Sequence, residues 1–171
     1  VSLLPKVLAA ARKGDDALLR VLIGAFEADG FEVIGAHEAT GALVTETGCM
    51  AGPEPDDNAL QDLQKAAHVA RESGRLDIGQ GAIVCNGLVL CVEAQEGTDA
   101  MLKRCASLDE AIRGTPAARR GVLVKRPKPI QDRRIDLPTV GVETVEAAAA
   151  AGLAGIGVET DGTLLVDRGG V

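Results

Sequence analysis

The sequence predicts an α/β fold, a single domain in which a mixed β-sheet is flanked by helices. Three observations support this prediction. Strand-like segments alternate with segments of helical periodicity, the turn dipeptides Asn86-Gly87 and Asp161-Gly162 join apolar runs, and 46% of the 171 residues are hydrophobic. A chain of this length can bury one substantial core. Because the chain has only two aromatic residues, we expect that core to consist of Ala, Val, Leu and Ile.

The N-terminal third is expected to contain one helix, one strand and a long loop. Apolar residues recur at helical spacing over 17–29, with Asp15 as the expected N-cap and Gly30 as the end of the helix. Residues 31–34 then have strand character. Residues 35–58 show little periodicity and include two prolines, which favours a loop or lid.

A second helix and a β-hairpin are expected next. Residues 59–73 have helical periodicity, and we interpret their charged side chains as a solvated face. Asn86-Gly87 then predicts a hairpin of strands 82–85 and 88–92, whose continuous apolar composition places both strands deep in a sheet.

The remaining elements follow from the same patterns. They are helical pieces at 99–106 and 108–112, a buried strand at 122–125, an alanine-rich helix at 142–151, and strands at 155–159 and 163–166 paired as a hairpin.

The four cysteines are expected to be free and buried, as in a protein of a reducing compartment. They show no CxxC spacing and have no nearby histidine, which argues against zinc. A two-residue turn places Cys85 opposite Leu88 and Cys91 opposite Ala82. The thiols of Cys85 and Cys91 then lie on different faces and cannot form a disulfide.

Several functional classes find little support in the sequence. It has no GxSxG or P-loop pattern, and neither His37 nor His68 has a neighbouring metal ligand. No stretch is long and apolar enough to span a bilayer. The scarcity of aromatic residues leaves almost no platform for base stacking, which argues against nucleic acid as a partner.

The strongest functional signal lies at residues 121–141. Eight of the 18 Lys and Arg residues fall within 113–134, together with only one of the 25 acids, although the net charge is −7. Three prolines restrict the loop that follows the strand at 122–125, so we expect it to be preorganised. Open α/β sheets bind ligands beyond the ends of their strands, and basic side chains suit phosphate oxygens. The basic candidates are Lys125, Lys128, Arg133 and Arg134.

The same loop carries two aspartates four residues apart, Asp132 and Asp136. With Ile135 between them, we expect one or both to turn inward, toward the basic side chains or a metal ion. The alternative is a surface loop whose charges pair with one another, and the sequence leaves both interpretations open.

A second candidate site is the acidic segment 93–99. Glu93, Glu96 and Asp99 leave the hairpin and open a helix, whose free N–H groups favour anions. Carboxylates beside a helix N-terminus are suited to holding Mg²⁺ and positioning a phosphate. The alternative is that Asp99 is a simple helix cap and Glu93 an ordinary acid at the end of a strand.

Several segments, taken in order, resemble one known family. These are Lys13-Gly-Asp-Asp, Phe31-Glu-Val-Ile-Gly-Ala-His-Glu, Leu76-Asp-Ile-Gly-Gln, Gly87-Leu-Val-Leu-Cys-Val-Glu-Ala-Gln-Glu-Gly-Thr-Asp-Ala, Gly121-Val-Leu-Val-Lys and Lys128-Pro-Ile-Gln-Asp-Arg-Arg-Ile-Asp-Leu-Pro-Thr-Val-Gly. Together they resemble the UDP-2,3-diacylglucosamine pyrophosphatases of lipid A biosynthesis that lack a calcineurin-like metal site. The resemblance spans nearly the whole chain.

The resemblance implies a hydrolase with Mg²⁺ as cofactor. Its expected reaction cleaves the diphosphate of UDP-2,3-diacylglucosamine into UMP and 2,3-diacylglucosamine 1-phosphate. Residues 1–171 would form the catalytic C-terminal domain, and the family's N-terminal lid domain would lie in another part of the same protein. A cytoplasmic location, with peripheral contact at the inner membrane through the lipid substrate, is implied as well. A homodimer is left open.

Site residues carried over from the resemblance combine the two candidate segments. Asp132 is the first catalytic candidate and Asp136 the second. The expected metal ligands are Asp132, Glu93, Glu96 and Asp99, and the expected substrate-binding residues are Lys125, Lys128, Arg133, Thr98 and Gln131. Residues 39–50 are a candidate groove for the acyl chains.

Two alternatives to this enzyme remain. The first is a non-catalytic nucleotide or sugar-phosphate-binding domain. The second is a nucleic-acid-binding domain that uses the basic stretch 113–134.

Overall fold

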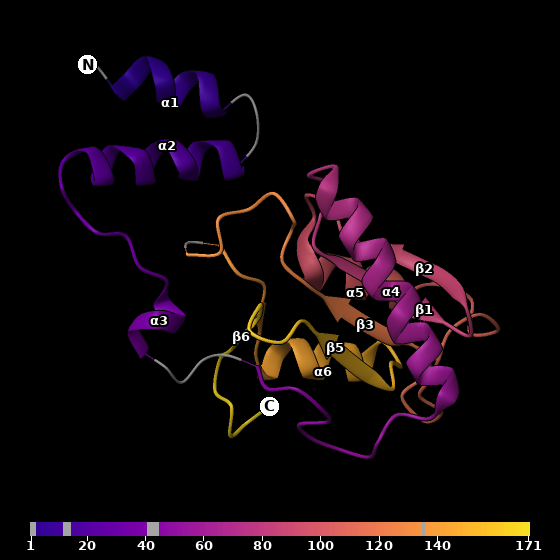
Figure 1. Ribbon diagram of the computed structural model, residues 1–171. Helices are drawn as coiled ribbons and strands as arrows, with labels where there is room; N and C mark the ends of the chain where they lie inside the picture. The colour runs from indigo at the N-terminus through magenta and orange to yellow at the C-terminus, as the bar shows by residue number, and fades with distance from the viewer. Residues whose placement is uncertain (1–2, 12–14, 41–44, 135) are drawn as a thin grey trace.

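A computed structural model describes residues 3–11, 15–40, 45–134 and 136–171 (Figure 1). The helices are α1 (Leu3–Ala11), α2 (Asp15–Ala28), α3 (Ala36–Thr40), α4 (Asp57–Arg75), α5 (Gly97–Ala106) and α6 (Val142–Ala150). The strands are β1 (Gly81–Cys85), β2 (Leu88–Val92), β3 (Val122–Lys125), β4 (Thr139–Val140), β5 (Gly155–Val158) and β6 (Leu164–Leu165).

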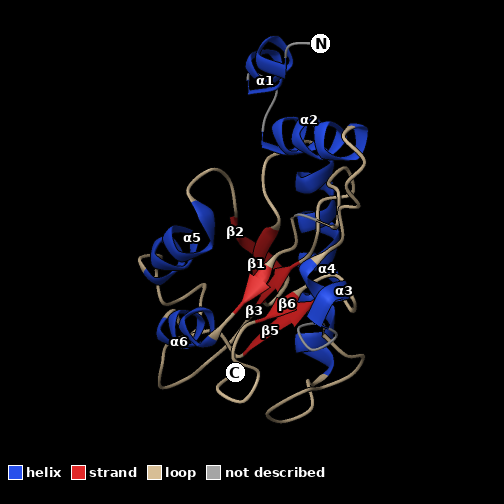
Figure 2. Cartoon of the chain, turned by 90° about the vertical axis from the view of Figure 1, so that its left-hand side faces the viewer, coloured by secondary structure: helices blue, strands red, loops and turns tan. Residues whose placement is uncertain are grey.

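The predicted mixed sheet is confirmed. Its strand order is β2-β1-β3-β5, with β1 antiparallel to both β2 and β3, and β3 parallel to β5. Helix α4 covers one face, while α5 and α6 cover the other (Figure 2). Because side chains alternate along a strand, Ile83 and Leu123 pack toward α5 and α6, whereas Val84 and Val124 pack toward α4.

The predicted hairpin is present, but its second strand is not deep in the sheet. β2 pairs only with β1 and forms an edge, so the side chain of Leu88 is 52% exposed. The register also shifts between Ile83 and Val84, which places Cys91 opposite Ile83 instead of Ala82. An apolar run does not distinguish an edge strand from a central one, and a bulge leaves no clear signature in the sequence.

Helix α4 confirms the prediction for 59–73 and extends it by two residues at each end. Asp56 is its N-cap and accepts a hydrogen bond from the N–H of Ala59 at 2.8 Å. The expected solvated face has one exception, because Asp62 is buried. Its carboxylate accepts from the backbone N–H groups of Asn86 at 2.8 Å and Gly87 at 2.7 Å, and so fixes the hairpin turn.

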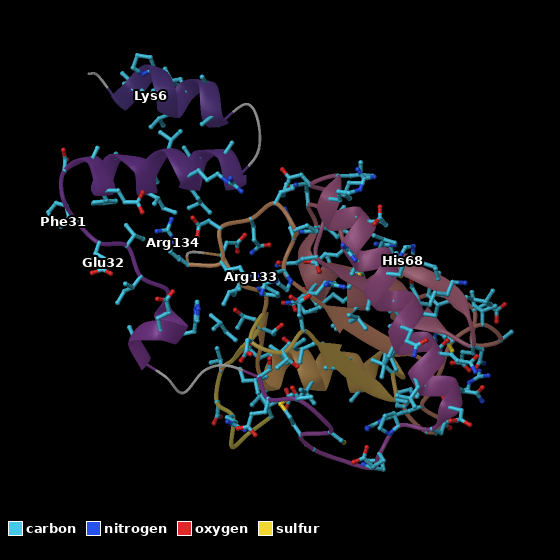
Figure 3. The ribbon with its side chains drawn as sticks, viewed as in Figure 1. Lys6, Phe31, Glu32, His68, Arg133 and Arg134 are labelled. Carbon is cyan, nitrogen blue, oxygen red and sulfur yellow. The ribbon has the colours of Figure 1, made fainter. Side chains whose placement is uncertain are left out.

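The N-terminal region differs most from the prediction. Helix α2 is close to the expected span, α1 was not predicted, and the side chain of Asp15 lies outside the described residues. Residues 31–34 are not a strand, because they pair with no segment in the described part of the chain. Phe31 is 63% exposed, and Figure 3 shows it with Glu32 at the edge of the molecule. Strand propensity without a partner strand does not produce a strand.

The expected loop at 35–58 is only partly described. It contains the short helix α3, and residues 41–44 lie outside the described residues, so the acyl groove expected at 39–50 cannot be traced. After them, the Thr45 hydroxyl donates to the carbonyl of Glu159 at 2.9 Å, which ties this segment to the end of β5.

The C-terminal region contains two further differences. Residues 108–112 form turns instead of a helix. The chain does turn at Asp161-Gly162, but β5 and β6 do not pair as a hairpin. Instead, β6 pairs in parallel with β4, a two-residue strand that was not predicted. Pairing over two residues is too short to be recognised from periodicity.

The cysteines are all free, as predicted, but only three are buried. Cys85, Cys91 and Cys105 lie in the core, whereas Cys49 is exposed on the loop before α4. A side-chain hydrogen bond from Cys105 lowers the pKa of Cys91 to about 7, and the same bond raises the pKa of Cys105.

Candidate functional site

A cavity of about 630 Å³ opens where β3 ends. The N-terminal ends of α5 and α6 form two of its walls, and the β4–β6 ribbon contributes another. Its lining residues are Glu96, Gly97, Thr98, Asp99, Lys125, Thr139, Gly141, Val142, Glu143, Thr144, Val166 and Asp167. This volume lies within the range typical of small-molecule sites.

Helix α5 presents its first turn to the cavity. Gly97 has φ +77°, a conformation that favours glycine, and it turns the chain sharply from the end of β2 into the helix. Glu96 is the N-cap but makes no side-chain capping bond. Asp99 lies inside the first turn, so the interpretation of Asp99 as a simple N-cap is wrong. The first N–H groups of the helix have no partner within it.

Lys125 is a buried cation at the end of β3. Its side chain is 6% exposed, and its Nζ donates to the carbonyl of Thr139 at 2.8 Å. Burial lowers the pKa of Lys125, against the opposing effect of the nearby carboxylates of Glu93 and Asp99. Lys125 therefore brings a poorly hydrated positive charge to the cavity.

Glu93 lies next to this cation and is equally buried. Burial raises its pKa, while Lys125 and a hydrogen bond from the Thr98 hydroxyl oppose that rise. Among the residues that the structure describes, none forms a hydrogen bond with the Oε2 atom of Glu93. Gly81 makes room for the carboxylate, since a Cβ at that position would lie 2.3 Å from Oε2 of Glu93. A buried carboxylate oxygen without a partner is costly and marks a position where a ligand can supply one.

The wall formed by α6 begins at its N-cap, Gly141. The backbone N–H of Gly141 donates to the Thr144 hydroxyl at 3.5 Å, and the carbonyl of Gly141 accepts from the Thr144 N–H at 3.0 Å. The strand before it, β4, is held in place by β6: the N–H of Leu164 donates to the Pro138 carbonyl, and that of Val166 to the Val140 carbonyl.

The structure brings together the predicted residues of the acidic segment and one from the basic stretch. Thr98, Glu96, Asp99 and Lys125 line the cavity, with Glu93 beside Thr98 and Lys125. The predicted residues on the loop after β3 are not among the lining residues. They are Lys128, Gln131, Asp132, Arg133 and Asp136.

Asp132 is enclosed by Arg134. The guanidinium Nε donates to Oδ1 at 3.0 Å and Nη2 to Oδ2 at 2.7 Å, and the backbone N–H of Arg134 also donates to Oδ1 at 3.0 Å. These hydrogen bonds lower the pKa of Asp132 to about 2. Arg134 in turn pairs with Glu27 of α2 at 2.7 Å, and Figure 3 shows it between the loop and that helix.

The other loop residues also have partners within the fold. Lys128 pairs with Asp77 at 2.7 Å, and Arg133 pairs with Glu159 at 2.6 Å. Gln131 braces the loop, because its Oε1 accepts from the Lys128 N–H and its Nε2 donates to the carbonyl of Asp136. The interpretation of a loop whose charges pair with one another holds for Asp132 and Arg134, whereas Lys128 and Arg133 pair with acids elsewhere in the fold. The predicted substrate contacts of Lys128, Gln131 and Arg133 stay predictions.

The remaining arginines of the basic stretch are also largely bound within the protein. Arg113 donates to the carbonyls of Leu108 and Gly114, and Arg120 donates to the carbonyls of Glu110 and Arg113. Arg126 pairs with Glu159 at 2.5 Å. The charge concentrated in the sequence therefore does not form a free basic surface of the kind that binds phosphate backbones.

Eight lining residues were not predicted as site residues: Gly97, Thr139, Gly141, Val142, Glu143, Thr144, Val166 and Asp167. Two features of the sequence could have indicated Thr139, Gly141 and Glu143. The segment Leu-Pro-Thr-Val-Gly at 137–141 is part of the family resemblance, and a helix is predicted to begin directly after it. Asp167 reaches the cavity only because β6 pairs with β4, which no local pattern predicts.

Within the described part of the chain, no helix is both long and apolar enough to cross a membrane. The LpxI C-terminal domain family matches residues 46–171. A curated relative is the UDP-2,3-diacylglucosamine pyrophosphatase LpxI of Caulobacter vibrioides, which is 58% identical over 168 residues. That alignment covers 98% of this chain and 60% of the relative, so the chain spans about three fifths of the relative's length. The chain belongs to the LpxI family, and its residues 46–171 match that family's C-terminal domain.

Proposed function

We propose that the protein hydrolyses the diphosphate of UDP-2,3-diacylglucosamine, giving UMP and 2,3-diacylglucosamine 1-phosphate, as a step of lipid A biosynthesis. The observation that supports this most directly is the cavity at the end of β3. There the buried ammonium of Lys125, the first turn of α5 and the unpartnered carboxylate oxygen of Glu93 lie together. The name of the Caulobacter relative supplies the substrate.

The charge of the cavity favours a diphosphate that arrives with a cation. Its lining includes a single lysine and four acids, Glu96, Asp99, Glu143 and Asp167, of which Glu96 is paired with Arg104 at 2.6 Å. A free diphosphate would be repelled by this surplus of negative charge. We therefore propose Mg²⁺ as the cofactor.

The residues present fit the way Mg²⁺ is usually held. No group of three or more His, Cys, Asp or Glu side chains among the described residues could hold a metal ion by itself. Mg²⁺ is commonly bound by one or two carboxylates together with substrate phosphates and water. Glu93, with its unpartnered oxygen, and Asp99 in the cavity wall are the residues that would hold it. When bound, Mg²⁺ would neutralise charge on the phosphate oxygens.

Side chains of the cavity have separate tasks in this proposal. Lys125 donates to phosphate oxygens, while its hydrogen bond to the Thr139 carbonyl fixes the position of the ammonium. The N–H groups of the first turn of α5 bind a second set of oxygens, and the Thr98 hydroxyl lies within the same turn.

Asp132 is proposed to orient the attacking water. With a pKa of about 2, it stays ionised at neutral pH and can accept a hydrogen bond from that water. Because Asp132 does not line the cavity, the loop after β3 has to bring it closer when substrate binds. Asp136 is the second candidate for this role; it lies on the same loop, where its backbone N–H donates to the carbonyl of Asp132 at 3.2 Å.

We further propose that the protein acts in the cytoplasm and meets the membrane surface only through its lipid substrate. The N-terminal lid domain of the same protein is the proposed partner that covers the substrate. Nucleic acid is not a proposed partner, because most of the basic side chains of 113–134 are bound within the fold.

The decisive experiment measures UMP release from UDP-2,3-diacylglucosamine by the full-length protein. Turnover is expected with Mg²⁺, is expected to stop when EDTA removes the metal, and is expected to fall by at least about a hundredfold in Asp132→Ala. Asp29→Ala, which changes an exposed acid after α2, is the matched control and should retain full activity.

One result would contradict this function, and another would contradict the role proposed for Asp132. Binding of UMP without turnover by the full-length protein would identify a nucleotide or sugar-phosphate sensor. Near-normal turnover in Asp132→Ala would leave the hydrolase in place but remove Asp132 from its mechanism.

A further inference from the structure

Gly141 is a glycine that the fold does not require. Its φ of −132° and ψ of −179° are extended values that any residue adopts. A Cβ built there would find Val166 O at 3.7 Å and Val166 Cβ at 3.8 Å, which is ordinary van der Waals contact. Gly157 differs, because a Cβ there would lie 2.4 Å from Cδ2 of Leu63.

Gly141 also lies at a position where a side chain would normally stabilise the fold. It is the N-cap of α6, where Ser, Thr, Asp or Asn stabilises a helix by bonding a free N–H of the first turn. The Thr144 hydroxyl bonds only the N–H of Gly141 itself. A sequence shaped by stability alone would favour a capping side chain here.

Gly141 also lines the cavity, and the rest of the cavity indicates a bound group. Lys125 contributes a buried cation and is fixed by the carbonyl of Thr139, two residues before Gly141. Independently, Glu93 is 94% buried and has an unpartnered oxygen, next to the lining residues Thr98 and Lys125. Glycine is a common choice where a backbone must approach a ligand closely.

We propose that Gly141 is a positioning residue of the diphosphate site, at which phosphate oxygens of the ligand meet the backbone N–H groups of the first turn of α6. One phosphoryl group lies against α6, and the other lies against Lys125 and α5. A side chain at position 141 would occupy the place of the first group. This inference rests on the proposed function, because it takes the ligand to be a metal-bound diphosphate.

The test compares Gly141→Ser and Gly141→Ala with Gly155→Ala in the full-length protein. Gly155 is the matched control: a Cβ there meets only Val122 Cγ1 at 3.9 Å, and the residue does not line the cavity. The probes are inorganic pyrophosphate and UMP, each with Mg²⁺, measured as Kd by calorimetry beside thermal melting and kcat/KM.

We expect both Gly141 variants to raise the Kd for magnesium pyrophosphate and to lower kcat/KM, each on the order of tenfold or more. The Tm of Gly141→Ser should equal or exceed that of the unaltered protein, because serine caps the helix. Gly155→Ala should keep unaltered Kd and kcat/KM.

Two outcomes would overturn the proposal. Unchanged Kd and kcat/KM in Gly141→Ser would show that no ligand approaches this position, and a marked loss of Tm in Gly141→Ser would show that glycine is needed by the fold. Weaker pyrophosphate binding in the Gly141 variants, with no hydrolysis of the UDP-lipid by any protein, would support the subsite while contradicting the proposed reaction.

Discussion

Lys125 combines three properties that suit a binding site. It ends a buried strand, lies on the cavity wall, and carries its charge at 6% exposure. A charge in such surroundings is weakly screened, so it would act on a phosphate of the proposed substrate more strongly than a surface lysine does.

Replacing this lysine with an apolar residue of similar length tests that role. Lys125→Met is expected to lower kcat/KM by about a hundredfold or more, because one preorganised donor to the phosphate is lost. Lys103→Met, on the exposed surface of α5, is the matched control. If both variants keep full activity in the UMP-release assay, Lys125 is not a phosphate ligand.

The pKa of Asp132 predicts how the stability of the protein depends on pH. Its pKa is about 2 in the folded protein, lowered by Arg134, and near 3.8 without that partner. A carboxylate whose pKa is depressed on folding stabilises the protein above the unfolded value, and this contribution is lost as the pH falls through the folded value. Asp132→Asn should therefore be less stable than the unaltered protein above about pH 4, with the difference vanishing toward about pH 2.

Urea unfolding across that pH range measures the difference directly. Asp29→Asn serves as the control for changing one acid to an amide. A stability difference that stays constant down to about pH 2 would mean that the pairing with Arg134 is not responsible.

At the scale of residues, the sequence predicts the cavity residues correctly where residues close in the chain are also close in the structure. Thr98 and Asp99 follow Glu93 closely, and Lys125 ends the strand that lies beside β1 in the sheet. The sequence also predicted that Asp132 could turn toward basic side chains, but it did not identify Arg134 as the partner, and it did not predict that Glu159 pairs with two arginines. A charged residue does not reveal from the sequence which opposite charge it will meet.

At the scale of elements, Asp62 of α4 holds the turn of the β1–β2 hairpin in place. Its carboxylate binds two consecutive N–H groups of the hairpin turn at 2.7 and 2.8 Å, while Lys65 donates to the carbonyl of Gly87. The hairpin, and the acidic segment that follows it, are therefore positioned by α4 as well as by the sheet.

Asp62→Ala should remove this support. Two N–H groups lose their acceptor, so the free energy of unfolding is expected to fall by about 2 kcal/mol. Chemical denaturation of Asp62→Ala beside Gln61→Ala, an exposed neighbour on α4, measures the effect. Equal stability of the two variants would show that water replaces the carboxylate without cost.

The elements that the sequence predicted well are those with long periodic or continuous patterns. Helix α4, the strands of the hairpin, β3 and α6 all belong to this group. The failures, 31–34, 108–112 and the pairing of β5 with β6, depend on partners distant in sequence. The local sequence sets the preference of a segment for helix or strand, and its tertiary contacts determine whether the segment adopts that structure.

At the scale of the molecule, the mixed sheet separates two environments at the carboxyl ends of β3 and β5. Lys125 extends to the side of α5 and α6, where the cavity lies. The next residue, Arg126, extends to the side of α4, where it bonds to the carbonyl of Ala67 and to Glu159. The last residue of β3 and the residue after it thus lie on opposite sides of the sheet, one at the site and the other at the structural support behind it.

The burial of the core predicts how the four thiols react. Cys49 is exposed, while Cys85, Cys91 and Cys105 are enclosed between the sheet and its helices. One thiol should react rapidly with a disulfide reagent in the native protein, and the other three only on unfolding. Absorbance of the released thiolate counts them, and Cys49→Ser should abolish the rapid phase. A second rapid thiol would mean that α5 opens readily from the sheet.

The parallel pairing of β4 with β6 affects the order in which parts of the protein fold during synthesis. The wall that carries Thr139 and Gly141 is anchored by Leu164 and Leu165, which leave the ribosome only after α6 and β5 have been made. Because domains fold as their parts emerge, a nascent chain can assemble β1, β2 and β3 against α4 before this anchor exists. Competence to bind at this cavity is then acquired only after β6 has emerged, so translation stalled just before β6 is expected to yield an ordered product with an incomplete cavity wall.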